Sequence, residues 1–228
     1  MVQYDNMTPG IFLRRPNRFI AHVVLDGTEQ VCHVKNTGRC RELLPAGASV
    51  WCRHSDDPKR KTAWDLITVQ KGRRLINMDS QAPNRAAMDY VQAGGLGFVP
   101  TLVKPEQVWG NSRFDLYVED DLGRPGYVEV KGVTLEREDV AYFPDAPTER
   151  GVKHLRELAA AAKQGLRAWL LFVVQMEGIL RVEPNRDTDP EFALALAEAR
   201  AAGVQLRAVG CRITPDTMEC AEEIPVIV

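Results

Sequence analysis

The segment from Gly110 to Gly132 constrains the fold of this chain more than any other, because it combines two alternating patterns around one turn. In SRFDLYV, apolar and polar residues alternate, which is the period of a strand with one buried face. The run EDDLGRPG is acidic and contains glycine and proline, so it predicts a turn. YVEVKGV then resumes the alternation. The segment therefore predicts a β-hairpin.

Three ionisable side chains occupy polar positions of this hairpin. Asp115 lies in the first strand, and Glu129 and Lys131 share one face of the second. Antiparallel pairing would bring all three together. Two carboxylates suit Mg²⁺ or Mn²⁺, which bind through one or two carboxylates with phosphate oxygens and water, and a lysine beside them would orient a water or stabilise charge on a phosphate. A surface ion pair is the alternative interpretation of this spacing alone.

Asp115 followed by Glu129-Val130-Lys131 resembles the acidic-plus-lysine signature of the restriction-endonuclease-like nucleases. The wider chain resembles the sugar fermentation stimulation protein A family. The segments that carry this resemblance are, in chain order, GIFLRRPNRF, NTGRCRELL, PKRKTAWDL, the PN of QAPNR, GNSRFDL, VEVKGVTL, FPDAPTERGVKHLREL and DPEFALAL. The resemblance implies an oligonucleotide/oligosaccharide-binding (OB) barrel followed by a nuclease core.

The first third of the chain has the pattern of short strands separated by turns. RFIAHVVL and QVCHV flank Asp26-Gly27, a dipeptide that predicts a hairpin turn, and ASVWCR, AWDLITVQ and RRLINMD supply further strands. Short strands without a long helix suit a small OB-like barrel, in agreement with the resemblance. We place this barrel at residues 1–80, because the polar, proline-containing NMDSQAPNR predicts a boundary.

Basic charge gathers in the same region. Residues 11–74 carry 13 lysines and arginines against 6 acidic residues, whereas the whole chain has a net charge of −2. This asymmetry indicates a polyanionic partner, DNA with RNA as the alternative. Each cation taken alone has a solvated surface position as its alternative, and the NTGR turn that contains Arg39 has an ordinary structural turn as its alternative. The candidate phosphate-binding residues here are Arg14, Arg18, Arg39, Arg41, Arg60 and Lys61.

Residues 81–228 alternate helical and strand patterns. AAMDYVQAGG predicts a short helix, and Thr148 and Asp189 predict the N-caps of two longer helices. The continuous apolar run RAWLLFVVQ predicts a central strand buried on both faces, and VQLRAVGCRI predicts another strand. We therefore expect a restriction-endonuclease-like α/β domain with a mixed sheet flanked by helices and the carboxylates at one edge.

Three further residues are candidates to complete the site. In related nuclease folds an acidic residue on an early helix completes the metal site, and Asp89 holds that kind of position. Glu106 is a second candidate metal ligand, since its strand would lead toward the same cluster. Gln175 ends the central strand, where a polar side chain could reach the site.

Three basic side chains of this domain are candidates for nucleic-acid contact. Arg113 precedes Asp115 by two residues on the same strand and could bind a neighbouring phosphate. Arg150 and Lys153 lie in the first turns of the helix capped by Thr148, where anions are favoured. The helical pattern places them on a polar face together with His154, and a solvated face is the alternative explanation.

Together these patterns predict a barrel that holds nucleic acid and a domain that cuts it, a nuclease dependent on Mg²⁺ or Mn²⁺ with Asp115, Glu129 and Lys131 as catalytic residues. The main alternative is a sequence-tolerant DNA-binding regulator of sugar-metabolism genes (maltose-type genes, for example) without catalysis, as the family name suggests. A third interpretation is metal-dependent hydrolysis of a small phosphate or sugar compound. The extended basic bias of the barrel weighs against it.

The chain starts without the basic residues and apolar core of a signal peptide, and its longest apolar run, AWLLFVV, has the length of a strand. We therefore expect a cytoplasmic protein that does not enter a membrane. The five cysteines are odd in number and form no CxxC pair, so we expect reduced packing residues. The oligomeric state is open, with a homodimer as one alternative.

Overall fold

The computed structural model describes residues 1–36, 38 and 40–228, and within them five strands close into a barrel, as expected from the sequence. Neighbours pair antiparallel in the order β4-β3-β2-β5-β6, and a parallel pairing of β4 with β6 closes the ring. β7 (Arg74–Asn77) extends the sheet beside β6. The barrel strands are β2 (Met7–Asn17), β3 (Ile20–Leu25), β4 (Thr28–Val34), β5 (Ser49–His54) and β6 (Trp64–Lys71).

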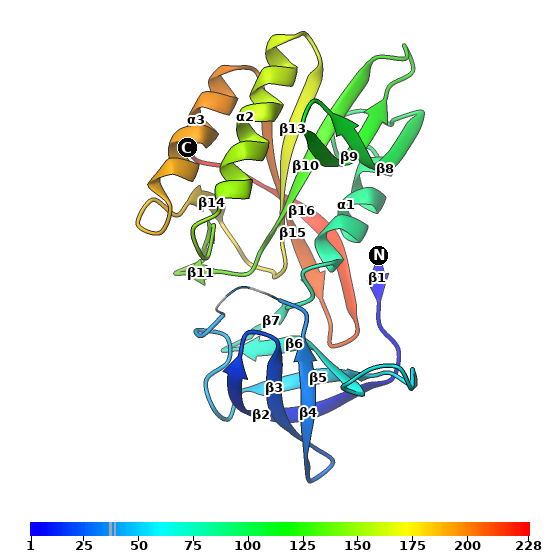
Figure 1. Ribbon diagram of the computed structural model, residues 1–228, viewed down its shortest axis with the longest axis vertical. Coiled ribbons are helices and arrows are strands. Elements are labelled where there is room, and N and C mark those ends of the chain that lie inside the picture. The colour runs from blue at the N-terminus through cyan, green and yellow to red at the C-terminus, as the bar shows by residue number, and fades with distance from the viewer. Residues whose placement is uncertain (37, 39) are drawn as a thin grey trace.

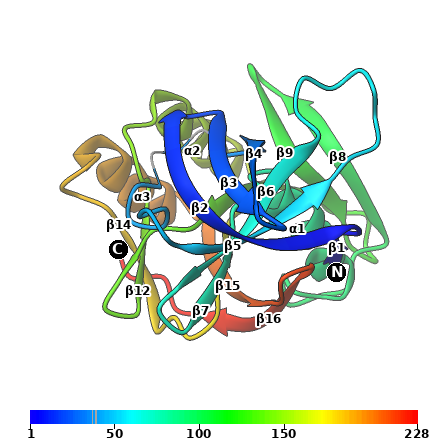
Figure 2. The same ribbon diagram turned by 90° about the horizontal axis from the view of Figure 1, so that it is seen from below.

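The barrel interior is filled by alternate apolar residues of its strands. Ala21, Val23 and Leu25 of β3 are buried, while the residues between them are partly exposed. β2 is long and curves across the barrel between β3 and β5 (Figure 2). Gly10 allows this crossing, because a Cβ atom there would lie only 2.4 Å from the Leu25 side chain.

The larger sheet holds seven strands in the described part of the chain, in the order β1-β16-β15-β13-β10-β9-β8. β10, β13 and β15 run parallel and the outer pairs run antiparallel, which gives the expected mixed sheet. Its strands are β1 (Val2–Gln3), β8 (Leu102–Trp109), β9 (Ser112–Glu119), β10 (Pro125–Val133), β13 (Arg167–Val174), β15 (Gln205–Ile213) and β16 (Thr217–Ile224). β11 (Glu136–Arg137), β12 (Val140–Phe143) and β14 (Arg181–Pro184) form a small third sheet.

Helices cover both faces of the larger sheet (Figure 1). α1 (Ala82–Gln92) packs on one face, and α2 (Glu149–Lys163) and α3 (Pro190–Ala201) pack on the other. β13 lies between them: Leu170 and Phe172 join the core under α2 and α3, while Trp169 and Leu171 join the core under α1. The continuous apolar run therefore does form a strand buried on both faces.

The chain start lies outside the barrel. β1 pairs antiparallel with β16, with Val2 opposite Met218, so the first residues lie against the larger sheet and not against the barrel (Figure 1). The chain then passes into β2 and the barrel. Among the described helices, none is both long and apolar enough to cross a membrane.

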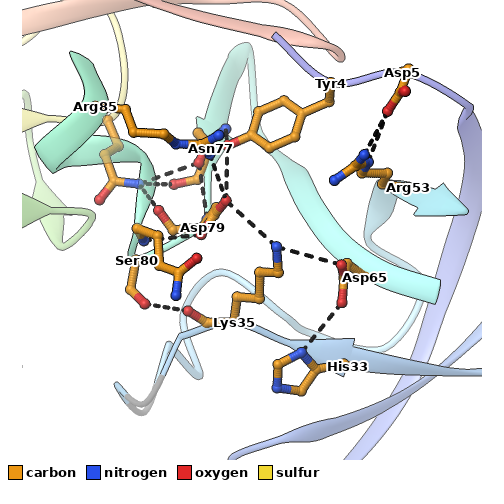
Figure 3. A network of polar contacts seen from close by, with 12 residues as sticks. Tyr4, Asp5, His33, Lys35, Arg53, Asp65, Asn77, Asp79, Ser80 and Arg85 are labelled. Atoms are coloured by element: carbon orange, nitrogen blue, oxygen red, sulfur yellow. Dashed lines mark hydrogen bonds and ion pairs between the residues drawn. The ribbon is translucent and has the colours of Figure 1, made fainter. Parts of the chain in front are cut away.

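Two buried aspartates mark the junction between the barrel and the larger sheet. Asp65 lies on β6 and Asp79 lies just before α1, and neither is exposed. Lys35 lies between them, with its ammonium 3.5 Å from Asp65 and 4.0 Å from Asp79 (Figure 3). Arg60 pairs with Asp65 from the barrel side, and Tyr4 donates to Asp79 over 3.1 Å. Paired charges therefore replace apolar packing at this point of the junction.

Candidate active site

The β9–β10 hairpin forms as predicted, but its ladder ends before the candidate residues. Pairing runs from Glu119 opposite Pro125 to Leu116 opposite Val128 and stops there. Beyond this point a side chain joins the two strands in place of the backbone, since Asp115 Oδ2 accepts a hydrogen bond from the Val130 backbone N at 2.8 Å. Asp115 is therefore fixed where the two strands separate.

Asp115 receives its second hydrogen bond from helix α1. Asn84 Nδ2 donates to Asp115 Oδ1 at 2.8 Å. Burial raises the pKa of the Asp115 carboxyl, and the neighbouring negative charge of Glu129 raises it further. A carboxylate in this position would be stabilised as an anion by a nearby cation.

Glu129 is more deeply buried than Asp115. Its Oε1 accepts a hydrogen bond from Lys131 Nζ at 2.6 Å and a second from His154 Nδ1. Burial by itself would raise the pKa of Glu129, but the bonds from His154 and Lys131 outweigh it, and the pKa lies below its usual value. Glu129 Oε2 is buried and has no hydrogen-bond partner in the described part of the chain. Glu129 therefore presents one satisfied and one unsatisfied oxygen.

His154 was expected on the exposed face of its helix, and that expectation is wrong. The side chain is buried against Glu129, with 6% of the residue exposed. Arg150 Nε lies 3.4 Å from His154 Nε2 on the other side of the ring. The two ring nitrogens of His154 therefore face Glu129 and Arg150 respectively. The chain Arg150–His154–Glu129 thus joins the first turn of α2 to β10.

The backbone after Lys131 is closely packed by side chains of two other segments. Gly132 follows Lys131, and a Cβ atom at Gly132 would lie 2.6 Å from both Gln175 Oε1 and the Pro83 ring. Gln175 itself turns toward the barrel, where Nε2 donates to the Asn77 carbonyl at 2.8 Å. Gln175 therefore lies next to the site, but its amide group binds β7, the strand beside β6.

The two additional metal candidates lie outside the cluster. Asp89 is hydrogen-bonded to the amino group of Met1, and the α1 residue that contacts Asp115 is Asn84. Glu106 lies in β8 between the paired residues Pro105 and Gln107 with a φ of 53°, and its exposed carboxylate lies 3.5 Å from Arg113 Nη1. Neither carboxylate hydrogen-bonds to the residues of the cluster.

The candidate phosphate-binding residues fall into three groups. Arg14 and Arg60 are neutralised by acidic neighbours, Glu29 and the buried Asp65 respectively. Arg39 lies outside the described residues. The remaining candidates are exposed: Arg18, Arg41, Lys61, Arg113, Arg150 and Lys153.

The exposed candidates of the larger domain lie beside the cluster on two elements. Arg113 is on β9, two residues before Asp115. Lys153 Nζ donates to the Asn111 carbonyl at 3.3 Å, which links α2 to the start of β9. Together with Arg150 on α2, they bring three cations to the surroundings of the two carboxylates, although Arg113 pairs with Glu106 and Lys153 pairs with Glu157.

The donor set fits a hard divalent cation. Among the described residues, no group of three or more His, Cys, Asp and Glu could hold a metal ion by itself. Mg²⁺ and Mn²⁺ do not need one, because they bind through one or two carboxylates with phosphate oxygens and water. Asp115 and Glu129 supply two carboxylates, and no residue that the structure describes hydrogen-bonds to the buried Glu129 Oε2. A buried polar atom without a partner is costly, and a cation would satisfy it.

Comparison with known proteins identifies relatives over the whole length. Residues 81–217 match the family described as "Sugar fermentation stimulation protein RE domain", and residues 13–78 match "SfsA N-terminal OB domain". A sugar fermentation stimulation protein homolog of Clostridium beijerinckii is 49% identical over 226 residues, which cover 99% of this chain and 100% of that protein. A homolog from Desulfitobacterium hafniense is 50% identical over 225 residues, with coverages of 99% and 98%.

One solved structure also matches along the whole chain. The structure of Pyrococcus furiosus SfsA in complex with Ca²⁺ has a TM-score of 0.87 and 28% sequence identity to this chain. The match covers 100% of this chain and 98% of that one. The order of a barrel followed by an α/β domain is therefore shared with a solved relative.

Proposed function

Since this chain belongs to the sugar fermentation stimulation protein family, we propose that it is a nuclease that uses a divalent cation to hydrolyse phosphodiester bonds of DNA or RNA. The observation that carries the proposal is the pair of neighbouring carboxylates, the half-buried Asp115 and the buried Glu129, beside the ammonium of Lys131. In this proposal residues 1–80 hold the nucleic acid and residues 81–228 cut it.

Asp115 and Glu129 would hold Mg²⁺ or Mn²⁺, and that cation supplies Lewis-acid polarisation of the phosphodiester. The Pyrococcus furiosus relative is in complex with Ca²⁺, another hard divalent cation that binds through oxygen atoms. This supports a divalent cation as the cofactor of the family fold.

Lys131 is the residue that acts on the reacting phosphate. Its ammonium lies 2.6 Å from Glu129 Oε1, close enough to orient the attacking water or to stabilise the charge that grows on the phosphate. Water adds to phosphorus as the ester P–O bond breaks. Asn84 and His154 position the two carboxylates, each through one hydrogen bond.

Exposed cations would place the polymer. Arg113 and Arg150 lie next to the carboxylates in the structure, and both side chains reach solvent. Contacts of this kind position a nucleic acid without reading its sequence. We therefore expect sequence-tolerant cleavage.

A cleavage panel tests the proposal. The purified protein is incubated with end-labelled single- and double-stranded DNA and RNA in the presence of Mg²⁺, Mn²⁺ or a chelator. We expect metal-dependent cleavage of at least one polymer, and a loss of roughly a hundredfold or more in rate for Asp115→Ala and for Lys131→Ala. Asp121→Asn removes an exposed carboxylate from the turn of the same hairpin and should leave the rate unchanged.

Two results of this panel would contradict the proposal or the residues assigned to it. If the polymers are bound but stay intact under every metal condition, the nuclease proposal fails. Binding without cleavage is what a DNA-binding regulator of sugar-metabolism genes would give. Cleavage that survives in Asp115→Ala and Lys131→Ala would place the chemistry elsewhere.

A further inference from the structure

A cavity of about 400 Å³ lies between the barrel and the segment that precedes α2. The barrel contributes its β2 strand, the β2–β3 turn and the segment after β4, and the larger domain contributes the loop before Thr148. The lining includes Arg15, Asn17, Arg18, Gly38, Arg41 and Ala146. Gly38 packs against this loop so closely that a Cβ atom there would meet the Asp145 carboxylate at 2.2 Å.

The cavity has a concentrated positive charge. Three of its lining residues are arginines, and no described acidic residue lines it. Arg18 and Arg41 have no acidic partner within ion-pair distance among the described residues, whereas Arg14 and Arg53 of the same barrel pair with Glu29 and Asp5. Arg15 is fixed at the cavity wall, since its Nη2 donates to the Asn36 carbonyl at 2.8 Å.

This lining suits a phosphate group better than a base or an apolar ligand. Guanidinium groups bind phosphate oxygens through paired hydrogen bonds, and they lose less hydration than an ammonium. No aromatic side chain among the described residues lines the cavity, so it offers no surface on which a base could stack. Its volume lies within the usual range for ligand pockets, roughly 300 Å³ and above.

The position of the cavity connects it to the carboxylate cluster. Ala146 precedes Thr148, the N-cap of α2, by two residues. The first turns of α2 then carry Arg150 and His154, and His154 contacts Glu129. A strand whose phosphate occupied the cavity could therefore follow the start of α2 toward Asp115 and Glu129.

We propose that this cavity binds a phosphate group of the nucleic acid that is distinct from the phosphate being cleaved, an inference that rests on the proposed nuclease function. The bound group is either a 5′-terminal phosphate or an internal phosphate of the backbone. Arg18 and Arg41 supply the charge, and Arg15 forms the wall.

The test compares Arg18→Gln/Arg41→Gln with the wild-type protein and with Arg53→Gln, which removes one cation from the same barrel outside the cavity. Kd is measured by fluorescence anisotropy, in chelator, for three single-stranded DNAs of equal length: linear with a 5′-phosphate, linear with a 5′-hydroxyl, and covalently closed. Cleavage of the same DNAs in Mn²⁺ is followed separately. Both substituted arginines are exposed, so the variant is expected to fold.

We expect the double variant to bind about tenfold or more weakly, and its log K to fall with log salt about one unit less steeply than that of the wild type. Weakening confined to the 5′-phosphorylated strand identifies a terminal phosphate, and equal weakening of all three strands identifies a backbone phosphate. Equal Kd values for the double variant and Arg53→Gln on every strand overturn the inference, even if the wild type cleaves. Absence of cleavage with a preserved difference in Kd overturns the nuclease proposal and leaves the phosphate site intact.

Discussion

Glu129 accepts two hydrogen bonds on Oε1 and, among the described residues, none on Oε2. Lys131 and His154 therefore fix the direction of the carboxylate without using the oxygen that a cation would need. Asp115 is instead fixed through both of its oxygens, Oδ1 by Asn84 and Oδ2 by the backbone of Val130. Carboxylates oriented in advance would need little rearrangement to bind a cation together with a phosphate.

His154→Ala tests the positioning of Glu129. Loss of a hydrogen bond behind a metal ligand typically lowers metal affinity or activity about 10- to 100-fold. We expect the Mn²⁺ concentration that gives half-maximal cleavage to rise by that order, with a smaller change in the rate at saturating Mn²⁺. Arg156→Gln, an exposed change on the same helix, serves as the control. An unchanged Mn²⁺ dependence in His154→Ala would contradict the positioning role.

The buried Asp65 gives a prediction about stability and pH. Burial opposes its charge, but Arg60, Lys35 and His33 together hold its pKa below the usual value. A group with a lowered folded pKa stabilises the protein above its unfolded pKa, about 3.9, and this contribution is lost as pH falls through the folded pKa. Arg60→Gln should therefore cost about 3 kcal/mol of unfolding free energy at pH 7.

Urea denaturation of wild type and Arg60→Gln at pH 7 and at successively lower pH measures this difference. The gap between the two proteins should narrow below about pH 4, as Asp65 becomes protonated in the unfolded chain and then in the folded one. A gap that is constant with pH would mean that Arg60 stabilises the barrel by packing. Lys61→Gln, an exposed neighbour, is the control.

At the scale of the residue, the sequence predicted that Asp115, Glu129 and Lys131 would lie near one another, but it did not predict the residues that hold them. Asp115, Glu129 and Lys131 follow from period-two alternation in two strands, which is a local pattern. His154 is three residues after the buried Gly151 and four before the buried Leu158. This helical spacing places His154 on the inner face of α2, although a polar side chain was expected on the outer face. Asn84 meets Asp115 across 31 residues of sequence, which no local pattern reveals.

At the scale of the element, the starts of α2 and α3 are joined by one carboxylate. Asp189 Oδ1 accepts from Phe192 N as the cap of α3, and Oδ2 accepts from Thr148 N, just before α2. Thr148 in turn caps α2 through the Gly151 N. Asp189 therefore helps to place the helix that carries Arg150 and His154.

Asp189→Ala should destabilise the protein more than Thr148→Ala. An N-cap side chain contributes about 1 kcal/mol, and Asp189 combines a cap with a second buried hydrogen bond, so we expect about 1 kcal/mol for Thr148→Ala and about 2 kcal/mol for Asp189→Ala. Thermal or urea unfolding measures both, with the exposed Asp187→Ala as control. Equal effects of the two substitutions would contradict the double role.

Elements with strong local patterns were predicted, and those that depend on partners were not. α2 and α3 have caps in the sequence, and β13 has a continuous apolar run. β2 contains Pro9, Gly10 and Pro16, which locally favour a turn, yet it forms a barrel strand because β3 and β5 flank it. β16 carries three glutamates, Glu219, Glu222 and Glu223, and becomes a strand through its pairing with β15 and β1.

At the scale of the whole molecule, the barrel and the larger sheet share one buried core. Val34 and Ile76 of the barrel belong to the same apolar cluster as Leu155 of α2 and Phe172 of β13. The charged junction of Lys35 with Asp65 and Asp79 adds contacts between the two parts (Figure 3). Division of the chain at residue 80 into independent domains remains a prediction.

A shared core predicts a single unfolding transition. Calorimetry should give one heat-capacity peak, with equal calorimetric and van't Hoff enthalpies. Circular dichroism, which reports on secondary structure, and tryptophan fluorescence, which reports on the surroundings of the four tryptophans, should give coincident curves. Two resolved peaks would show instead that the barrel and the larger domain unfold separately.

The junction itself could not be predicted from the sequence. Lys35, Asp65 and Asp79 belong to three segments that are brought together only by closure of the barrel and by packing of α1. The proposed phosphate-binding cavity could not be predicted either. Its arginines lie in two barrel segments, and its opposite wall is the loop before α2. The charge bias of residues 11–74 indicated an anionic partner but not its place of contact.

The central claim is that Asp115 and Glu129 form one site for a divalent cation, and calorimetric titration of Mn²⁺ into the metal-free protein tests it most directly. The account predicts saturable binding to the wild type, retention of that binding in Asp121→Asn, and its loss in Asp115→Asn and Glu129→Gln. Binding of equal affinity in all four proteins, or none to the folded wild type, would contradict the claim.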